Sequence, residues 1–461
     1  MRRFLACSAI AMAEVKTRMP SALQVGPSTL VPRVGSIFLA VAVPSLLYAA
    51  FILALVAFPT LEAHVIYMHR LTLMRSVDAL NTPELFGFMR NQVRPFTIPL
   101  PAPLSVGNIS VSSLTAPPTS SSSSQAAATE TLHAWHVLPL RRYSCHQEAL
   151  VAEPAGLVDD VTTTHGFSLL RDDPCAIVVI HLHGASGTMA SGLRPETYRA
   201  LAAADPTHVH VLALDYRGYG LSSGSSSPCE GGLIADAVAL ARWAMDVAQV
   251  PPERIVVHAQ SLGTAVAIGM VEYFATQQRP VEFGGLVLTA GMFDVASLMA
   301  EYRFNGVLRL MAPLDWLPAV LDWMRTKLRS TWRSGERLER VMAMLSRHHV
   351  ELLHAQDDRV VSVAHVHRLF EAAVAGSVRS GAVAVLDGEV NVAVAGAEVD
   401  VGASGAVWEW KSERGLIRKR VLSVGEHDRL MILPATSCAV LDASMAAGWS
   451  GGESCDGRAR C

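Results

Sequence analysis

Five short apolar segments that alternate with helical patterns constrain the fold of this chain more than any other feature. The segments occupy residues 175–184, 208–218, 254–261, 283–290 and 350–358. Each is rich in Val, Ile or Leu and ends near Gly, Ser or Asp, as buried parallel strands do. Alternation of such strands with helices is typical of a mostly parallel sheet that is covered on both faces. We therefore predict an α/β fold whose ligands bind beyond the carboxyl ends of the strands.

Residues 291–349 break this alternation with a long helical pattern that Pro313 and Pro318 interrupt. The segment contains three Trp residues and a basic set, namely Trp316, Trp323, Trp332, Arg325, Lys327, Arg329, Arg333, Arg337 and Arg340. We expect a helical cap over the strand ends. Whether its cations meet lipid headgroups or only form a solvated face stays open. Residues 376–415 are rich in Gly, Ala and Val, which indicates an inserted hairpin or a loosely ordered loop.

A hydrophobic content of 51% is high for a soluble protein and indicates a membrane segment. Residues 34–58 contain no charged residue. As a helix, this segment is ~37 Å long, enough to cross a hydrocarbon core of ~30 Å. It exceeds the ~7–15-residue apolar core of a cleaved signal peptide. We predict a transmembrane signal anchor, in which Pro44 is tolerated. A transit peptide is the minor alternative, because the first thirty residues contain Arg and few acidic residues.

The charges around this segment predict its orientation. Arg2, Arg3, Lys16, Arg18 and Arg33 precede it, whereas Arg70 and Arg75 follow closely. The positive-inside rule puts the N-terminus in the cytosol and the remaining chain in a lumen or outside the cell. A sequon at Asn108 and six of the seven Cys residues lie beyond the segment, which permits glycosylation and disulfides. Free thiols are an equally good interpretation. The net charge of -3 gives no indication of a nucleic-acid partner.

Residues 255–270, IVVHAQSLGTAVAIGM, join an apolar strand to a helix of small residues through Ser261. A small-x-Ser-x-Gly turn between strand and helix presents a nucleophilic serine in a strained backbone conformation. Gly263 provides the second small residue. Ala259 stands where glycine is usual, and we expect its methyl group to crowd the turn without preventing it. Ser261 is therefore the predicted nucleophile.

Such a serine needs a base and a carboxylate that orients the base, in the chain order Ser, acid, His. The strand at 350–358 ends in two carboxylates. Asp358 is the predicted acid and Asp357 a close rival. For either residue, the alternative role is an N-cap of the following helix.

Only three histidines follow these carboxylates: His365, His367 and His427. His365 and His367 lie on the helix directly after the acid, too near to it to reach the serine. His427 follows a strand and is the predicted base, and the alternative is an ordinary loop histidine. The oxyanion requires two backbone N–H donors, which we assign to Leu262 and Ala185.

The motifs HLHGASGT, LDYRGYGLSSG, EGGLIADAVALARW, HAQSLGTAVA and HAQDDRVVS follow one another in this order. Together they resemble the α/β-hydrolase superfamily, and more closely its membrane-anchored monoacylglycerol and lysophosphatidylserine lipases. The resemblance covers residues 132–370 and extends more thinly to His427. It implies an α/β-hydrolase fold with a helical cap, and Ser261, Asp358 and His427 acting on acyl esters of glycerolipids in the lumen of the endoplasmic reticulum. It implies no metal and no organic cofactor. Ser362 and the segment LTAGMFD depart from the family pattern and bear on substrate specificity.

The sequence thus predicts five regions: a cytosolic tail at 1–33, the anchor at 34–58, a linker at 59–131, the hydrolase domain at 132–435 and a disordered tail at 436–461. A lipid ester and the bilayer are the predicted partners. A catalytically silent fold that serves as a binding module, and a thioesterase or peptidase with the same three residues, are the alternatives.

Overall fold

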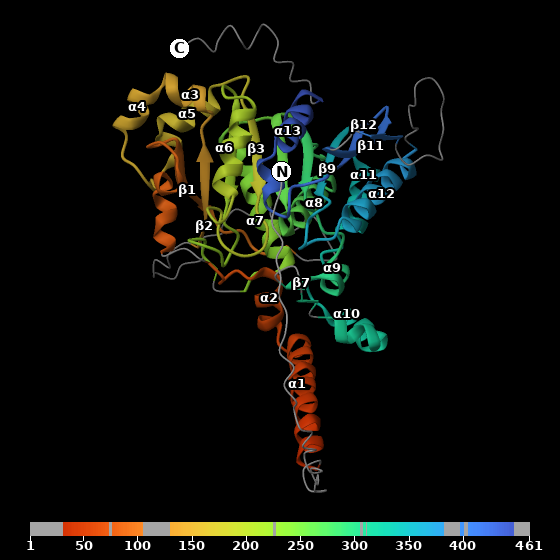
Figure 1. Cartoon of the computed structure of the whole chain (residues 1–461). Helices are drawn as coiled ribbons and strands as arrows, with labels where there is room; N and C mark the ends of the chain where they lie inside the picture. The colour runs from red at the N-terminus through yellow and green to blue at the C-terminus, as the bar shows by residue number, and fades with distance from the viewer. Residues whose placement is uncertain are drawn as a thin grey trace, which may run out of the picture. The chain divides into compact units, whose positions relative to one another are not determined.

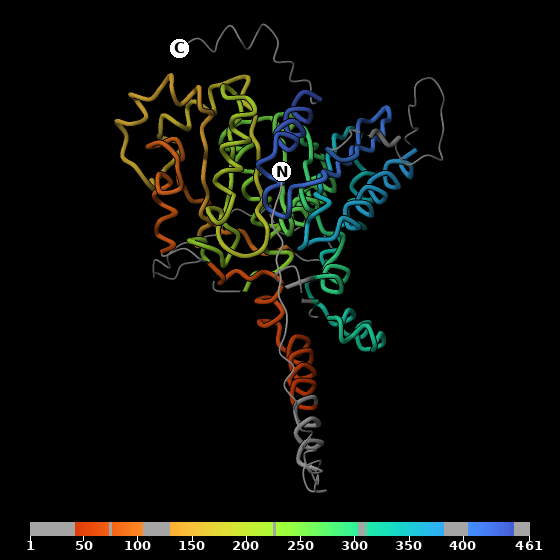
Figure 2. Tube along the Cα trace, viewed as in Figure 1, coloured from red at the N-terminus to blue at the C-terminus, as the bar shows by residue number. Residues whose placement is uncertain are grey.

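The computed structural model describes the chain in several stretches, whose course Figure 2 traces. They are residues 31–72, 76–104, 130–224, 227–304, 308–309, 311–381, 397–400 and 404–446. The chain divides into two units, which meet in sequence between Ala57 and Phe58. The sequon at Asn108, residues 1–30 of the predicted tail, and residues 447–461 lie outside the described stretches.

The first unit contributes helix α1, Val31–Ala57, over the predicted membrane anchor. Its side chains are described from Ala42 onward. Among the described residues, no single helix has the length and apolar composition of a membrane span. Ala42–Ala57 meets both requirements only when it is combined with the next helix, α2, Pro59–Tyr67. The transmembrane anchor at 34–58 therefore stays a prediction.

The second unit is built on a ten-stranded sheet with the order β1-β2-β4-β3-β5-β6-β9-β12-β11-β10 (Figure 1). The strands are β1 (Val93–Pro99), β2 (Thr131–Val137), β3 (Ile177–Leu182), β4 (Val209–Leu214), β5 (Ile255–Gln260), β6 (Gly285–Thr289), β9 (His348–Ala355), β10 (Ala397–Asp400), β11 (Gly405–Ser412) and β12 (Gly415–Leu422). The six central strands, from β4 to β12, run parallel, and antiparallel strands extend both edges. The five predicted strands and the α/β class are confirmed.

Helices cover both faces of the sheet (Figure 1). On one face lie α6 (Arg194–Ala204) and α13 (Pro434–Ala446), and on the other lie α7 (Glu230–Arg242), α8 (Leu262–Ala275), α11 (Ser334–Met344) and α12 (Ala364–Arg379). Alternate residues of a strand enter the two cores: Val178 packs in the core with α7 and α8, and Val179 packs in the core with α6 and α13. Both faces are buried, which explains why the strand sequences are continuously apolar.

The remaining helical elements are shorter. They are η1 (Val77–Asn81), η2 (Pro83–Phe86), α3 (Leu140–Cys145), α4 (Gln147–Ala152), η3 (Val161–Thr163), α5 (His165–Arg171), the π-helix η4 (Trp243–Val247), η5 (Pro252–Arg254), α9 (Val295–Glu301), η6 (Ala312–Trp316), α10 (Pro318–Lys327) and η8 (Arg429–Ile432). A separate two-stranded sheet pairs β7 (Arg303–Phe304) with β8 (Leu308–Arg309).

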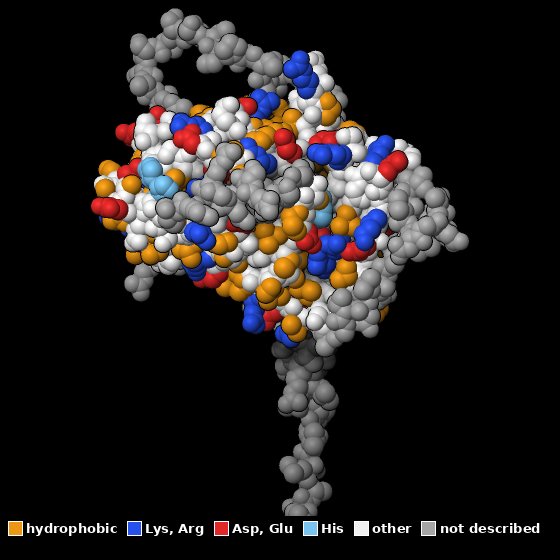
Figure 3. Space-filling view, turned by 90° about the horizontal axis from the view of Figure 1, so that it is seen from above, with side chains coloured by type: hydrophobic (Ala, Val, Ile, Leu, Met, Phe, Trp, Pro, Cys, Tyr) orange, Lys and Arg blue, Asp and Glu red, His pale blue; other side chains and the backbone are white. Residues whose placement is uncertain are grey.

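The surface seen from above carries charges of both signs. In Figure 3 the described Lys and Arg side chains are interspersed with Asp and Glu.

Two predicted boundaries differ from the structure. Strand β1 lies inside residues 59–131, where we predicted a linker, because Phe96 and Ile98 are buried in the core. Helix α13 overlaps the predicted disordered tail at 436–461, because Ala439 and Val440 pack on the sheet. Both segments thus belong to the globular unit.

The predicted cap and insert also differ in extent. Helix α11 falls within the predicted cap at 291–349, yet it packs in the helical layer beside α8 and α12. The reason is its fully buried apolar stripe, which includes Leu338 and Val341. In the predicted insert at 376–415, α12 continues to Arg379, and β10 and β11 extend the sheet. Residues 382–396 and 401–403 lie outside the described stretches.

Candidate active site

Ser261 lies at the turn between β5 and α8. Its backbone φ of 53° and ψ of -122° are unfavourable for a residue with a side chain. The turn is held by neighbouring backbone, because the Ser261 N–H donates to the carbonyl of Thr289 at 3.1 Å and its carbonyl accepts from the Thr264 N–H at 2.9 Å. The strained strand-to-helix turn that the sequence predicts is therefore present.

The two small residues around this turn have unequal roles. A Cβ atom at Gly263 would lie 2.0 Å from the carbonyl oxygen of Leu182, so only glycine fits there. Ala259 is fully buried in β5, opposite Leu182 of β3 and Leu288 of β6. Its methyl group is accommodated within the ordinary strand pairing.

Asp358 and His427 are in contact at the carboxyl edge of the sheet. Strands β9 and β12 run parallel and end opposite each other, with Ala355 paired to Leu422. The loops that follow them therefore leave the sheet at the same edge, where His427 Nδ1 lies 2.8 Å from Asp358 Oδ2. Because a carboxylate only accepts, Nδ1 carries the proton, and Nε2 of the neutral ring keeps its lone pair.

This pair shifts the pKa of both of its members. Burial alone would lower the pKa of His427, but the hydrogen bond and the charge of Asp358 outweigh burial and raise it above 6.5. Burial would raise the pKa of Asp358, and the hydrogen bond and charge of His427 outweigh it, so that the pKa lies below its usual value. The Asp358 side chain is fully buried, whereas that of His427 is 13% exposed. Near neutral pH the arrangement keeps the acid ionised and the imidazole able to exchange a proton.

The two predicted oxyanion donors border the same turn. Leu262 is the first residue of α8, and Ala185 follows Gly184 in the loop after β3. A Cβ atom at Gly184 would lie 3.1 Å from the Cβ of Ser261, so this loop lies against the nucleophile. Within the described part of the chain, neither the Leu262 N–H nor the Ala185 N–H donates a hydrogen bond, and the Ser261 hydroxyl makes none.

A family model described as the alpha/beta hydrolase family matches residues 178–451, more than half of the chain. The chain belongs to the alpha/beta hydrolase family. The match confirms the family resemblance that the sequence motifs carry.

This α/β hydrolase is similar to named lipases over part of its length. It is 29% identical over 196 residues to lysophosphatidylserine lipase ABHD12 of Danio rerio, a match that covers 42% of this chain and 47% of the relative. It is 26% identical over 196 residues to protein ABHD12B of Homo sapiens, covering 42% of this chain and 49% of the relative. The chain thus spans about half the length of these relatives. Among solved structures, it aligns with the Pyrococcus furiosus esterase Pf2001 at a TM-score of 0.39 and 13% identity, covering 70% of this chain and 88% of the esterase.

Two residues of this α/β hydrolase hold the loop that carries His427. Asp357, the rival acid, accepts a hydrogen bond from the Glu426 N–H at 2.8 Å. Gln260, the neighbour of the nucleophile, donates through Nε2 to Asp428 Oδ1 at 3.2 Å and to the carbonyl of His427 at 3.5 Å. The His427 loop is thereby attached to both the acid loop and the serine turn. The local sequence around Gln260 does not indicate this contact, because Asp428 lies 168 residues further along the chain.

The other histidines near the acid are engaged elsewhere in this α/β hydrolase. His365 Nδ1 accepts from the Phe293 N–H at 3.0 Å, and His367 Nδ1 lies 2.8 Å from Lys419 Nζ. His354, which the sequence did not single out, has Nε2 3.0 Å from the Val361 carbonyl and 3.5 Å from Asp358 Oδ2. Its position four residues before Asp358, near the end of β9, is the signal that would have identified it. Among the described residues, no group of three His, Cys, Asp or Glu side chains suits a metal ion.

Proposed function

We propose that this chain is a membrane-anchored serine hydrolase that cleaves acyl esters of lipids. The observation that carries the proposal is the buried Asp358 carboxylate in contact with His427, at the edge of the sheet where the strained Ser261 turn also lies. An acid that orients a histidine beside a strained serine is the arrangement of serine hydrolases.

In the proposed mechanism, His427 Nε2 takes the proton of the Ser261 hydroxyl as the oxygen attacks the ester carbonyl. The positive charge that forms on the ring is stabilised by the ionised Asp358. The N–H groups of Leu262 and Ala185 donate to the oxyanion of the tetrahedral intermediate. His427 then protonates the departing alcohol, and a water molecule activated by the same ring cleaves the acyl-enzyme. The reaction needs no group beyond the chain and water.

The proposed substrates are lysophospholipids or monoacylglycerols. The ABHD12 relative is named as a lysophosphatidylserine lipase, which supports a lipid with a single acyl chain. The match covers 47% of that relative, so the proposal names the lipid class and not a headgroup.

Anchoring of the chain at 34–58 in a bilayer is part of the proposal. Its support is the uncharged sequence of that segment and the exposure of Trp316 and Trp323 in and beside α10, which are 87% and 41% exposed. Trp side chains favour the membrane–water interface. Cys145 and Cys175 are disulfide-bonded, which fits a catalytic body in an oxidising lumen or outside the cell, with the N-terminus in the cytosol.

Labelling with a fluorophosphonate probe tests the proposal. We expect the full-length protein to be labelled and the Ser261→Ala variant not to be. Both are then assayed against lysophospholipids, monoacylglycerols, thioesters and peptides. Hydrolysis of the lipid esters, abolished in the variant, supports the proposal. Absence of labelling in the folded protein favours a silent binding module, and preference for a thioester or peptide favours the corresponding alternative activity.

A further inference from the structure

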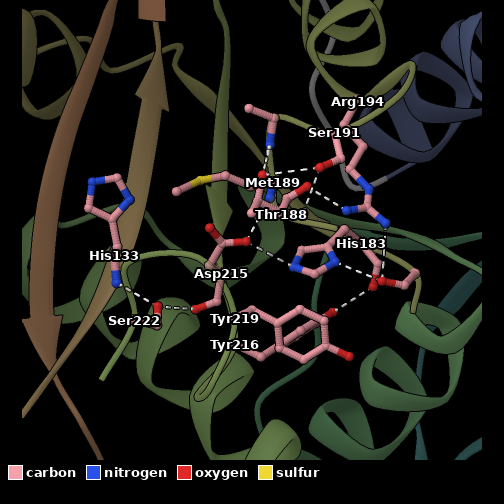
Figure 4. A network of polar contacts seen from close by, with 12 residues as sticks. His133, His183, Thr188, Met189, Ser191, Arg194, Asp215, Tyr216, Tyr219 and Ser222 are labelled. Carbon is pink, nitrogen blue, oxygen red and sulfur yellow. Dashed lines mark hydrogen bonds and ion pairs between the residues drawn. The ribbon is translucent and has the colours of Figure 1, made fainter. Parts of the chain in front are cut away.

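Arg194, the first residue of α6, contacts the loop that contains the proposed oxyanion donor Ala185. We call residues 184–188 the oxyanion loop. The Arg194 side chain is almost buried, and the residue is 8% exposed. Its guanidinium donates to four carbonyls of the oxyanion loop: those of Gly184 and Ala185, both at 3.2 Å, of Ser186 at 3.0 Å, and of Thr188. Figure 4 shows the Arg194 guanidinium beside Thr188 and His183.

The contact with Gly184 decides the direction of the Ala185 N–H. The Gly184 carbonyl and the Ala185 N–H belong to one peptide unit, which is planar and trans, so that they point in opposite directions. The carbonyl is held by Arg194 Nη2 at 3.2 Å and by His183 Nδ1 at 2.8 Å. The Ala185 N–H therefore points away from both side chains.

Two other N–H groups of the loop hold its shape. The Ser186 N–H donates to the carbonyl of Tyr67 at 3.0 Å, and the Gly187 N–H donates to the carbonyl of Leu71 at 2.8 Å. Gly187 has a φ of 67°, which glycine adopts readily, whereas the φ of 63° at Ser186 lies in the left-handed region that a residue with a side chain seldom adopts. Such a conformation persists only when surrounding contacts impose it. The contacts hold these two N–H groups and leave that of Ala185 without a partner in the described part of the chain.

The positive charge of Arg194 suits its surroundings, which are carbonyl oxygens of the oxyanion loop. No ion pair to a carboxylate involves Arg194 among the described residues. Its positive charge is met by carbonyl dipoles of the oxyanion loop, and it lies on the carbonyl side of the peptide whose N–H is free. A lysine would keep the charge, but a single ammonium lacks the planar fork that reaches several carbonyls at once.

We propose that Arg194 is a positioning residue that orients the Gly184–Ala185 peptide so that its N–H binds the oxyanion formed on attack by Ser261. The inference rests on the proposed function. In this proposal Arg194 acts through the Gly184–Ala185 peptide and not on the substrate itself. Its loss therefore weakens binding of the transition state and leaves binding of the ground-state substrate almost unchanged.

The test compares Arg194→Lys and Arg194→Met with Arg199→Lys in the full-length protein. Arg199 is a matched control, because it lies on the same helix and donates to a backbone carbonyl, that of Phe86 at 2.7 Å, outside the oxyanion loop. Rates on p-nitrophenyl butyrate are expressed per reactive serine, counted by complete fluorophosphonate labelling, so that misfolded protein does not contribute. The affinity of a trifluoromethyl ketone, which mimics the tetrahedral intermediate, is measured alongside.

We expect both Arg194 variants to lose about 10–100-fold in kcat with KM within about threefold, since removal of a whole oxyanion donor costs about 10²–10³-fold. The ketone should lose affinity by the same factor as kcat/KM. The inference is overturned if Arg194→Lys matches Arg199→Lys in kcat per reactive serine, or if only the number of reactive serines falls. In both cases the wild type remains active and the proposed function stands. A wild type that neither reacts with the probe nor hydrolyses the ester removes both proposals.

Discussion

Asp357 and Asp358 are adjacent in sequence, yet they bind different parts of one loop: Asp358 accepts from the ring of His427 and Asp357 from the backbone N–H of Glu426. This division of roles predicts unequal effects of the same substitution. We expect Asp358→Asn to lower kcat by about 10⁴-fold, because the amide no longer holds the required histidine tautomer.

The matched variant, Asp357→Asn, keeps an oxygen that can accept from Glu426. It should lose no more than about tenfold, because only the position of the loop is affected. Steady-state rates per reactive serine measure both variants. A larger loss in Asp357→Asn than in Asp358→Asn would reverse the assignment of the acid.

The raised pKa of His427 predicts the pH dependence of activity. The base is active when neutral, so kcat/KM should rise with pH through a midpoint above 6.5. Asp358 raises this pKa against the effect of burial, so the midpoint should move to lower pH in Asp358→Asn, at a much reduced rate. A profile from about pH 5 to about pH 9 measures both midpoints. A wild-type midpoint below 6.5 would contradict the predicted charge of the Asp358–His427 pair.

The raised pKa of His427 also makes the free energy of unfolding depend on pH. A folded pKa above the unfolded value means that the folded state binds the proton more tightly. The resulting stabilisation is present below about pH 6.5 and is lost as the pH rises through the folded pKa. The free energy of unfolding of Ser261→Ala, compared with that of Ser261→Ala/His427→Gln over this range, isolates the contribution.

Close packing at the serine turn predicts that its two small residues, Gly263 and Ala259, differ in their tolerance of substitution. Gly263→Ala would place a Cβ atom 2.0 Å from the Leu182 carbonyl oxygen, so the turn must move. We expect a destabilisation of more than about 2 kcal/mol and loss of labelling at Ser261. Ala259→Gly removes a methyl group and restores the usual family residue. It should cost about 0.5–1 kcal/mol and keep the activity, as urea unfolding and probe labelling would report.

The contact between Gln260 and the His427 loop predicts a role for the residue before the nucleophile. Gln260→Leu keeps the approximate volume but removes the hydrogen bonds to Asp428 and to the His427 carbonyl. We expect kcat to fall about tenfold, since one or two hydrogen bonds that hold the base are lost. Gln249→Leu, at an exposed glutamine whose contact is to the nearby Asp246 carbonyl, is the control and should leave kcat unchanged.

The exposed side chains of Trp316 in η6 and Trp323 in α10 predict that activity depends on the lipid surface. Trp316→Ser/Trp323→Ser should slow hydrolysis of a lysophospholipid in vesicles by about 3–10-fold, because interfacial aromatic contacts are lost. Its rate on soluble p-nitrophenyl butyrate should match that of the wild type. Leu157→Ser, at another exposed apolar residue, is the control. Equal losses on both substrates would show that the Trp residues act on the fold and not at the membrane.

The sequence alone determined the features that depend on neighbouring residues. Apolar runs of strand length and the periodicity of the helices between them specified the α/β class, and the small residues around Ser261 specified the strained turn. The basic, Trp-rich segment was recognised as a unit, but its sequence did not distinguish exposed from buried residues. In the structure Trp316 is exposed, whereas Trp332 is buried and donates to the Tyr67 hydroxyl.

Tertiary structure decided the contacts between residues that lie far apart in the chain. Two adjacent aspartates have the same local pattern, and only the parallel register of β9 and β12 brings His427, 69 residues away, to Asp358. Likewise, the direction of the Ala185 N–H depends on Arg194, which reaches the oxyanion loop from a separate helix. The physical reason is that backbone propensity and hydrophobic periodicity act over a few residues. Hydrogen-bond partners across a sheet edge are chosen by strand order and register, which only the assembled core determines.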